Sequence, residues 1–261
     1  MKLELQRDAC AFLYQHWANG IHCDGLPPDL LPADRAQAYQ VQACIEDYSE
    51  YAPIGWKIAA TSKAGQVHIG VDGPMAGRLL AERRIPDGGS LKLGNNLMKV
   101  AEMEFAFRFG EDLPPRAQTY AQAEVLAAVS ALHPAIELPD SRYRHFETVG
   151  DAQLIADNAC AHYFVLGAAS PDAWRELDLA SYQVHGLRNG SVAETGVGAN
   201  VLGDPRTALT WLVNELSQFG YCLKRDQVVI TGTCLKPLPI AVGDRLAGDF
   251  GQLGSVAVQI A

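Results

Sequence analysis

Residues 100–107 read VAEMEFAF, and they place two carboxylates, Glu102 and Glu104, inside an apolar run. In a β-strand, residues i and i+2 point to the same face of the sheet, so both glutamates face one side. An unpaired carboxylate is costly to bury, and two neighbouring carboxylates also repel each other. Two interpretations fit this pattern: an edge strand whose glutamate face meets solvent, or a buried pair that shares a cation.

A third acid, Glu137 in HPAIELPD (133–140), also stands inside an apolar run. Three carboxylates in hydrophobic surroundings suggest an oxygen-ligand site for a hard divalent cation such as Mg²⁺ or Mn²⁺, which would offset their mutual repulsion. The residue pattern by itself favours the solvent-face interpretation, because the glutamates alternate with apolar residues along the run. The cation interpretation therefore needs support from the rest of the chain.

The composition restricts the class of protein. The chain has 261 residues and a net charge of −9, without a basic cluster, which argues against nucleic acid as a partner. No apolar stretch approaches the roughly 20 residues that span a bilayer, so a membrane partner is not expected. The six cysteines form no CxxC pair, which argues against structural zinc and is typical of reduced thiols in a cytoplasmic protein.

The order of the predicted elements indicates an α+β protein. Residues 1–52 are predicted to be a helical region, because apolar residues recur there at helical spacing and prolines separate two such stretches. Residues 53–261 are predicted to form the main domain, in which short apolar runs alternate with Gly, Pro and Asp. Strands are predicted at 54–60, 98–110 and 162–168.

Three further patterns predict local structure. Residues 118–132, QTYAQAEVLAAVSAL, are predicted to be a helix that carries Leu126, Val129 and Leu132. Asn189-Gly190, between two alternating segments, predicts a β-hairpin. A helix is predicted to begin after Asp204, with proline at its first position and Gly220 at its end.

Several blocks of the sequence together resemble one family. They are GWKIAATSKAGQVHIGVDGP (55–74), the ExE strand, PAIELPDSR (134–142), IADNACAHYFVLG (155–167), ETGVGANVLGDPRTALTWLVNEL (194–216), VVITGTCLKPLPIAVGD (228–244) and GDFGQLGSV (248–256). In combination and in this order they resemble the 2-oxopent-4-enoate hydratases and the related 4-oxalocrotonate decarboxylases, which belong to the fumarylacetoacetate hydrolase superfamily. The resemblance covers roughly residues 50 to 260.

The resemblance implies a fold and a metal site. The implied fold is a fumarylacetoacetate-hydrolase-like mixed β-sheet roll with the N-terminal helices packed outside. The implied ligands of Mg²⁺ or Mn²⁺ are Glu102, Glu104 and Glu137, and the metal of the family chelates a 2-oxo acid. The resemblance further implies a cytoplasmic homo-oligomer, with a complex between related hydratase and decarboxylase subunits as an additional expectation.

Lys57 stands at the position of the family's active-site lysine, which implies that it transfers a proton or holds the substrate. Partial burial would lower the pKa of this lysine, whereas neighbouring carboxylates would raise it. The alternative interpretation is an edge-strand lysine that faces water, or a lysine that only forms an ion pair with one glutamate. Asp157 and Asn158 are candidates for holding a loop near the site, and Lys63 is interpreted as a surface charge.

The chain departs from the family pattern at several positions near the implied site. Met75 stands where hydratase relatives commonly have aspartate, and Cys160 with Ala161 replaces a pair of serines. The segment TGTCLKPLPI (231–240) places Thr233 and Lys236 near the predicted pocket mouth. Cys160, Thr233 and Lys236 are the candidates for substrate contacts. A buried inert thiol is the favoured interpretation of Cys160, and a solvent-facing loop lysine is the alternative for Lys236.

These residues lead to one main functional hypothesis and three alternatives. The main hypothesis is a metal-dependent lyase of aromatic catabolism that hydrates a 2-oxo-alkenoic acid, as a 2-keto-4-pentenoate hydratase does. The first alternative is decarboxylation of a 2-oxo-enedioate at the same site. Hydrolysis of a carbon–carbon bond in an acylpyruvate would need a His–Glu pair, but His16, His22 and His68 look isolated. The remaining alternative is a non-catalytic partner subunit.

Overall fold

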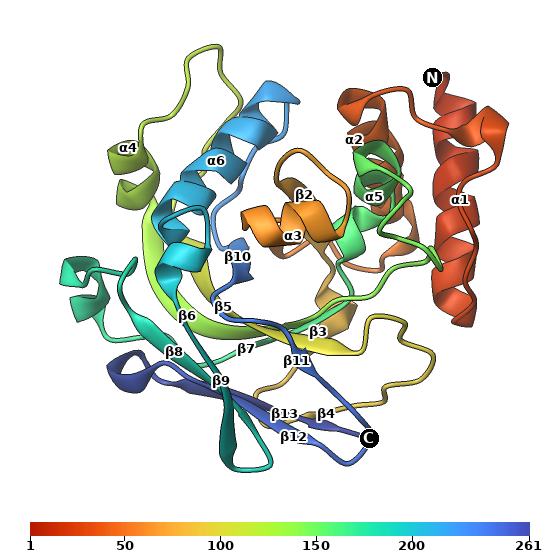
Figure 1. The fold of residues 1–261 in the computed structure, drawn as a ribbon. Helices are drawn as coiled ribbons and strands as arrows, with labels where there is room; N and C mark the ends of the chain where they lie inside the picture. Colours follow the sequence, from red (N-terminus) through yellow and green to blue (C-terminus); the bar gives the residue numbers. More distant parts are fainter.

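The computed structural model describes residues 1–261 as two β-sheets with helices packed around the larger one (Figure 1). The larger sheet is curled, and its strands follow the order β2-β1-β10-β5-β6-β7-β3, with β11 paired to β5. These strands are β1 (Gly55–Ala59), β2 (Met75–Leu79), β3 (Arg84–Ile85), β5 (Val100–Phe109), β6 (Val129–Leu138), β7 (Tyr163–Leu166), β10 (Val228–Thr233) and β11 (Leu238–Pro239).

The smaller sheet has the order β4-β13-β12-β8-β9 and lies below the larger sheet in Figure 1. Its strands are β4 (Ser90–Leu91), β8 (Gln183–Arg188), β9 (Ser191–Val197), β12 (Arg245–Asp249) and β13 (Ser255–Ile260). The predicted hairpin is confirmed, because β8 and β9 are antiparallel neighbours joined at Asn189 (φ 54°) and Gly190 (φ 81°). Positive φ at both turn residues matches the twist of the flanking strands.

Six α-helices cover the larger sheet, and no helix of the structure is long and apolar enough to cross a membrane. They are α1 (Leu3–Asn19), α2 (Arg35–Ala43), α3 (Lys63–His68), α4 (Gln122–Ala127), α5 (Asp151–Ala156) and α6 (Pro205–Gln218). Figure 1 shows α1, α2 and α5 together on one side and α4 with α6 on the other. The start of α6 is as predicted, since the Asp204 side chain accepts a hydrogen bond from Arg206 N.

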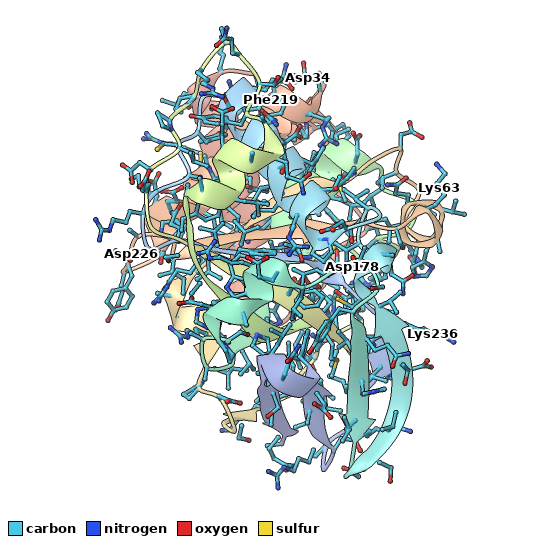
Figure 2. The ribbon with its side chains drawn as sticks, turned by 90° about the vertical axis from the view of Figure 1, so that its left-hand side faces the viewer. Asp34, Lys63, Asp178, Phe219, Asp226 and Lys236 are labelled. Carbon is cyan, nitrogen blue, oxygen red and sulfur yellow. The ribbon has the colours of Figure 1, made fainter.

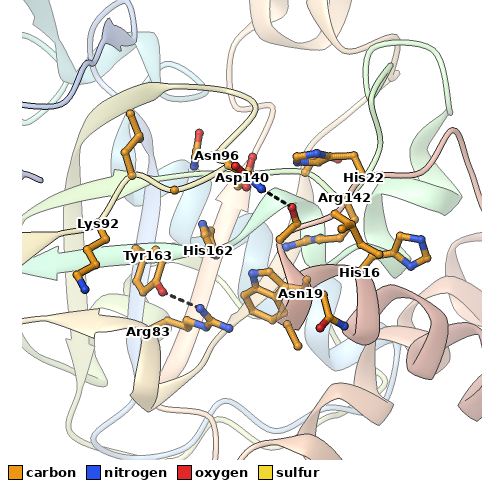
Figure 3. Close-up of a pocket in the computed structure, with 18 residues that line it drawn as sticks. His16, Asn19, His22, Arg83, Lys92, Asn96, Asp140, Arg142, His162 and Tyr163 are labelled. Carbon is orange, nitrogen blue, oxygen red and sulfur yellow. Dashed lines mark hydrogen bonds between the residues drawn. The ribbon is translucent and has the colours of Figure 1, made fainter.

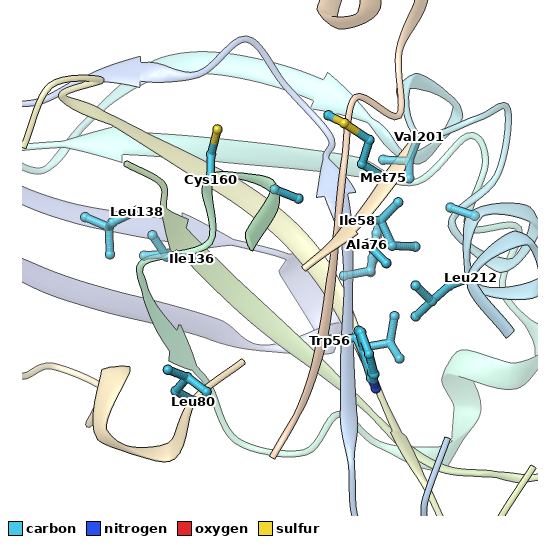
Figure 4. Packing of buried hydrophobic residues seen from close by; sticks show 14 of the residues in the cluster. Trp56, Ile58, Met75, Ala76, Leu80, Ile136, Leu138, Cys160, Val201 and Leu212 are labelled. Atoms are coloured by element: carbon cyan, nitrogen blue, oxygen red, sulfur yellow. The ribbon is translucent and has the colours of Figure 1, made fainter. Parts of the chain in front are cut away.

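The glutamate-bearing strand β5 lies in the middle of the larger sheet, between β10 and β6. The edge-strand interpretation of Glu102 and Glu104 is therefore wrong. One face of β5 buries Met103, Phe105 and Phe107 in the main core, part of which Figure 4 shows. The other face carries Glu102, Glu104 and Ala106 into the interior of the curl. Both faces of β5 are covered. The sheet curls around the glutamate face, and helices and the second sheet cover the other face.

The prediction of one helix over residues 118–132 is wrong. Helix α4 spans only Gln122–Ala127, and Val129 begins strand β6. The residues from Val129 onward pair with β5 along nearly its whole length and are buried almost throughout. The apolar spacing of this segment fits a helix equally well, so the long-range pairing with β5 decides the structure.

Candidate functional site

Strand pairing brings the three predicted metal ligands together. Glu102 and Glu104 project from β5, and Glu137 on β6 pairs directly with Glu102. One carboxylate oxygen from each residue lies within 4.8 Å of those of the other two. Glu104 and Glu137 are fully buried, whereas Glu102 is partly exposed and marks the open side of the cluster.

The charged forms of the three carboxylates are disfavoured in this arrangement, and some of their oxygens lack hydrogen-bond donors. Burial, with the charge of Glu137 as the second cause, raises the pKa of Glu102 to about 7. Burial also raises the pKa of Glu104 well above its usual value, and the pKa of Glu137 is raised for the same reason. Glu104 Oε1 and Glu137 Oε2 are buried without a hydrogen-bond partner. Two donor-less oxygens in a cluster of three carboxylates whose ligand atoms lie within 4.8 Å of one another fit a divalent cation with oxygen ligands.

The backbone of β10 orients Glu104. The pairing of β10 with β5 is interrupted between Ile230 and Thr233, and at this bulge Gly232 N donates a hydrogen bond to Glu104 Oε2. Gly232 has φ +110°, and a Cβ there would lie 2.0 Å from Thr61 Oγ1. Sequence reasoning missed this residue, although a glycine inside the run VVITGT is a signal for a bulge.

Lys57 lies beside the cluster on β1, an inner strand, so the edge-strand alternative is wrong, whereas the ion pair with one glutamate that the other alternative expects is present. Its side chain is 3% exposed, and its Nζ lies 2.9 Å from Glu137 Oε1 in an ion pair without hydrogen-bond alignment. Burial lowers the pKa of Lys57, but Glu137 and the two other glutamates together outweigh burial and hold the pKa above its ordinary value. The expected lowering by desolvation is therefore overcome by the carboxylates.

A left-handed turn at residues 158–160 holds the Lys57 ammonium. Lys57 Nζ donates to the Ala159 carbonyl at 3.1 Å. Asn158, Ala159 and Cys160 have φ values of 56°, 50° and 60°, a conformation that costs roughly 1–2 kcal/mol for each non-glycine residue. Such strain persists only where surrounding contacts enforce it.

Side-chain hydrogen bonds supply these contacts, in agreement with the predicted loop-holding role of Asp157 and Asn158. Asn158 Oδ1 accepts from Arg78 N at 2.6 Å, and Asn158 Nδ2 donates to Arg78 O at 2.9 Å. Asp157 forms a buried ion pair with Arg142 and accepts from Ser141 Oγ at 2.8 Å. The turn is thereby fixed to strand β2 on one side and to the end of β6 on the other.

We expect Gly77→Ala to destabilise the protein by about 2–3 kcal/mol, because the new methyl group overpacks the contact between strand β2 and the 158–160 turn. A Cβ at Gly77 would lie 2.3 Å from the Asn158 carbonyl oxygen and 3.2 Å from Lys57 Cδ. Urea denaturation measures the change. Gly73→Ala is the control, since no atom lies within 4 Å of its Cβ position, and a loss of the same size there would contradict the close-packing argument.

The three residues predicted to contact the substrate, Cys160, Thr233 and Lys236, differ in burial. Cys160 is buried, and burial raises its pKa to about 12, which makes it a neutral thiol. Thr233 pairs with Glu104 across the ladder, and its hydroxyl donates to Leu235 O at 2.8 Å. Lys236 and Lys63 are exposed and point away from the body in Figure 2, as predicted for Lys63. Met75 is fully buried in β2 and belongs to the main core (Figure 4).

Comparison with known proteins gives full-length relatives, although no family model matches. The chain is 31% identical to 2-keto-4-pentenoate hydratase 1 of Dechloromonas aromatica (strain RCB), covering 97% of this chain and 96% of the relative. It is 30% identical to the 4-oxalocrotonate decarboxylase of Pseudomonas sp. (strain CF600), covering 99% of each.

A solved structure agrees in fold over the whole chain. The 4-oxalocrotonate decarboxylase from Pseudomonas putida G7, complexed with magnesium and adipate, superposes with a TM-score of 0.90 at 27% identity, covering 100% of this chain and 99% of that one. The fold and family expected from the sequence are thus confirmed. The chain belongs to the family of lyases that includes the 2-keto-4-pentenoate hydratases and the 4-oxalocrotonate decarboxylases.

Proposed function

We propose that Glu102, Glu104 and Glu137 bind a divalent cation, Mg²⁺ or Mn²⁺, and that the protein uses it as a lyase to hydrate a 2-oxo-alkenoic acid similar to 2-keto-4-pentenoate. The observation that carries this proposal is the buried cluster of three carboxylates, two of which present oxygens without any donor. The magnesium complex of the related decarboxylase supports the choice of ion class.

The cation bound by the three glutamates would supply Lewis-acid polarisation of the 2-oxo group of the substrate. The chain itself fixes the ligands, because Gly232 N holds Glu104 and the β5–β6 pairing holds Glu102 beside Glu137. Burial of Glu104 and Glu137 excludes water from this side of the site. Partly exposed Glu102 leaves the approach for the substrate.

Lys57 is the group proposed to move the proton. An ammonium has three donor hydrogens. Ala159 O accepts one, and Glu137 lies within ion-pair distance, so a proton of Nζ remains for the substrate. Hydration adds the oxygen of water to the far carbon of the double bond that is conjugated with the 2-oxo group, and a proton to the near carbon. Lys57 would hold or deliver that proton.

Decarboxylation of a 2-oxo-enedioate is the second candidate, and Met75 favours it. By the resemblance, Met75 stands where hydratases commonly have an aspartate, and its fully buried thioether has no proton to transfer. Acylpyruvate hydrolysis is less well supported. His16 and His22 line a cavity that none of the three glutamates of the cluster lines, and His68 is exposed. The homo-oligomer and the complex with a related subunit stay predictions from the resemblance.

The two candidates differ in their products. We expect the Mg²⁺-loaded protein to consume 2-hydroxypenta-2,4-dienoate, measured as loss of the dienoate absorbance, and to release no CO₂ from a 2-oxo-enedioate. Release of CO₂ would assign the decarboxylase reaction to the same site. Inactivity toward both substrates with Mg²⁺ and Mn²⁺, in protein that binds the metal, would contradict the lyase proposal and favour the non-catalytic partner.

A further inference from the structure

A cavity of about 390 Å³ lies beside the C-terminal end of α1 (Figure 3). Its walls come from the end of α1 with the residues that follow it, Arg83, the segments 92–96 and 140–142, and His162 with Tyr163 at the start of β7. Leu138 pairs with Tyr163 and Glu137 pairs with Phe164, so Tyr163 and Glu137 point to opposite faces of the sheet. Neither Lys57 nor any of the three glutamates of the proposed metal site lines the cavity.

The cavity is lined by positive charge in a protein whose net charge is −9. Arg83, Lys92 and Arg142 face one acid in the lining, Asp140. Asp140 Oδ1 already accepts a hydrogen bond from Leu97 N at 2.7 Å. Arg142 forms an ion pair with Asp157, which does not line the cavity, but Arg83 and Lys92 form no ion pair. A cation-lined cavity without matching acids favours an anionic ligand.

Four residues that line this cavity carry a buried nitrogen atom without a hydrogen-bond partner. Trp17 Nε1, Arg83 Nε, Arg142 Nη1 and His162 Nδ1 are all buried without a hydrogen-bond partner. The guanidinium carbons of Arg83 and Arg142 lie 4.3 and 4.8 Å from the Trp17 ring centroid, and the His162 ring centroid lies 5.6 Å from it. Arg142 is only 3% exposed, so its free N–H is costly unless a ligand accepts from it.

The pKa of His162 is lowered by the same positive charges. Burial first, and then the charges of Arg142 and Arg83, lower the pKa of His162 to about 2. The imidazole is therefore neutral. Asp157 compensates Arg142, whereas Arg83 forms no ion pair with an acid of this chain. Guanidinium N–H groups match the geometry of carboxylate and phosphate oxygens.

We propose that this cavity is a second ligand site, which binds a small oxyanion, a carboxylate or a phosphate, through Arg83, Arg142, Trp17 and His162. Arg83 contributes the charge that no acid of the chain neutralises, and its Nη1 is held in place by donating to Tyr163 Oη at 2.8 Å (Figure 3). Arg142 supplies the most deeply buried donor. The volume suits a small organic acid or inorganic phosphate.

Isothermal titration calorimetry of metal-free protein in EDTA tests this site, with succinate and inorganic phosphate as probes. We expect one-site binding of at least one probe, weakened at least about tenfold in Arg83→Gln through loss of a charge-assisted contact. Arg84→Gln is the control, since it removes an exposed charge from the neighbouring residue and should leave the Kd unchanged. Glu104→Gln should also retain binding, which separates this site from the proposed metal site.

The probes identify the source of the oxyanion, because succinate alone would assign an organic acid and phosphate alone a phosphate. Absence of saturable binding of both probes up to roughly millimolar Kd would overturn the proposal. Equal weakening by Arg83→Gln and Arg84→Gln would also overturn it, since only the net charge would then matter. Circular dichroism verifies that each variant is folded.

Discussion

Glu104→Gln is expected to abolish metal-dependent turnover while the protein remains folded. Glutamine has the same shape but lacks the charge that would bind the cation, and Gly232 N can still donate to its amide oxygen. We expect the rate to fall at least about 10³-fold, the scale on which removal of a group that stabilises developing charge acts. Steady-state assays at saturating Mg²⁺ measure this loss.

Thermal unfolding shows whether the loss has the proposed cause. In the metal-free protein the variant should unfold at the same temperature or higher, because burial disfavours the charged form of Glu104 and Glu137 repels it. Mg²⁺ should raise the midpoint of the wild type, by mass action, and not that of the variant. Glu111→Gln, an exposed residue beyond the end of β5, is the control. Unchanged activity of Glu104→Gln would remove Glu104 from the site.

Lys57→Met is expected to lower the rate by about 10²–10⁴-fold and to preserve metal binding. Methionine nearly fills the buried volume of the lysine stem and removes the ammonium that contacts Glu137 and Ala159. Loss of a positive charge beside the carboxylates should leave the affinity for Mg²⁺ equal or higher. Calorimetric titration with Mg²⁺ and steady-state kinetics measure the two quantities separately.

Lys63→Met provides the matched control for this variant. Lys63 lies six residues further along the chain, is exposed, and should tolerate the same change without effect on rate or metal affinity. Full activity of Lys57→Met would exclude Lys57 from the proton transfer. Loss of metal binding together with activity would instead show that Lys57 maintains the carboxylate cluster.

The sequence predicts the identity of the central residues better than their surroundings. The spacing of Glu102 and Glu104 requires a shared face, and the structure shows that face. Whether that face is buried depends on the position of β5 in the sheet, which is set by pairing with β10 and β6 from distant parts of the chain. The apolar run around Glu137 makes it a candidate third ligand, and the family resemblance decides between this interpretation and the solvent-face one.

Local patterns succeed where short-range geometry decides and fail where long-range pairing does. Asn189-Gly190 and Asp204-Pro205 define a turn and a helix start by their own backbone preferences, and both predictions are confirmed. Val129 begins a strand despite helical spacing, because β5 offers a partner. The cavity around Trp17 has no sequence signal, since Arg83, Arg142 and His162 meet there only through tertiary packing.

The balance of charge around Lys57 also requires the structure. Its apolar neighbours in IGWKIAA suggest desolvation and a lowered pKa. The pairing of β5 with β6 places three carboxylates around the ammonium, and they reverse the direction of the shift. A cation bound by these carboxylates would weaken that effect and return Lys57 toward a pKa suited to proton transfer.

A crystal structure of the protein soaked with Mg²⁺ and oxalate tests the central claim most directly. Oxalate presents the two adjacent oxygens of a 2-oxo acid and cannot react. We predict one ion about 2.0–2.1 Å from an oxygen of each of Glu102, Glu104 and Glu137, with oxalate completing its coordination and within reach of Lys57. Mg²⁺ bound elsewhere, or oxalate bound without contact to a metal held by these glutamates, would contradict it.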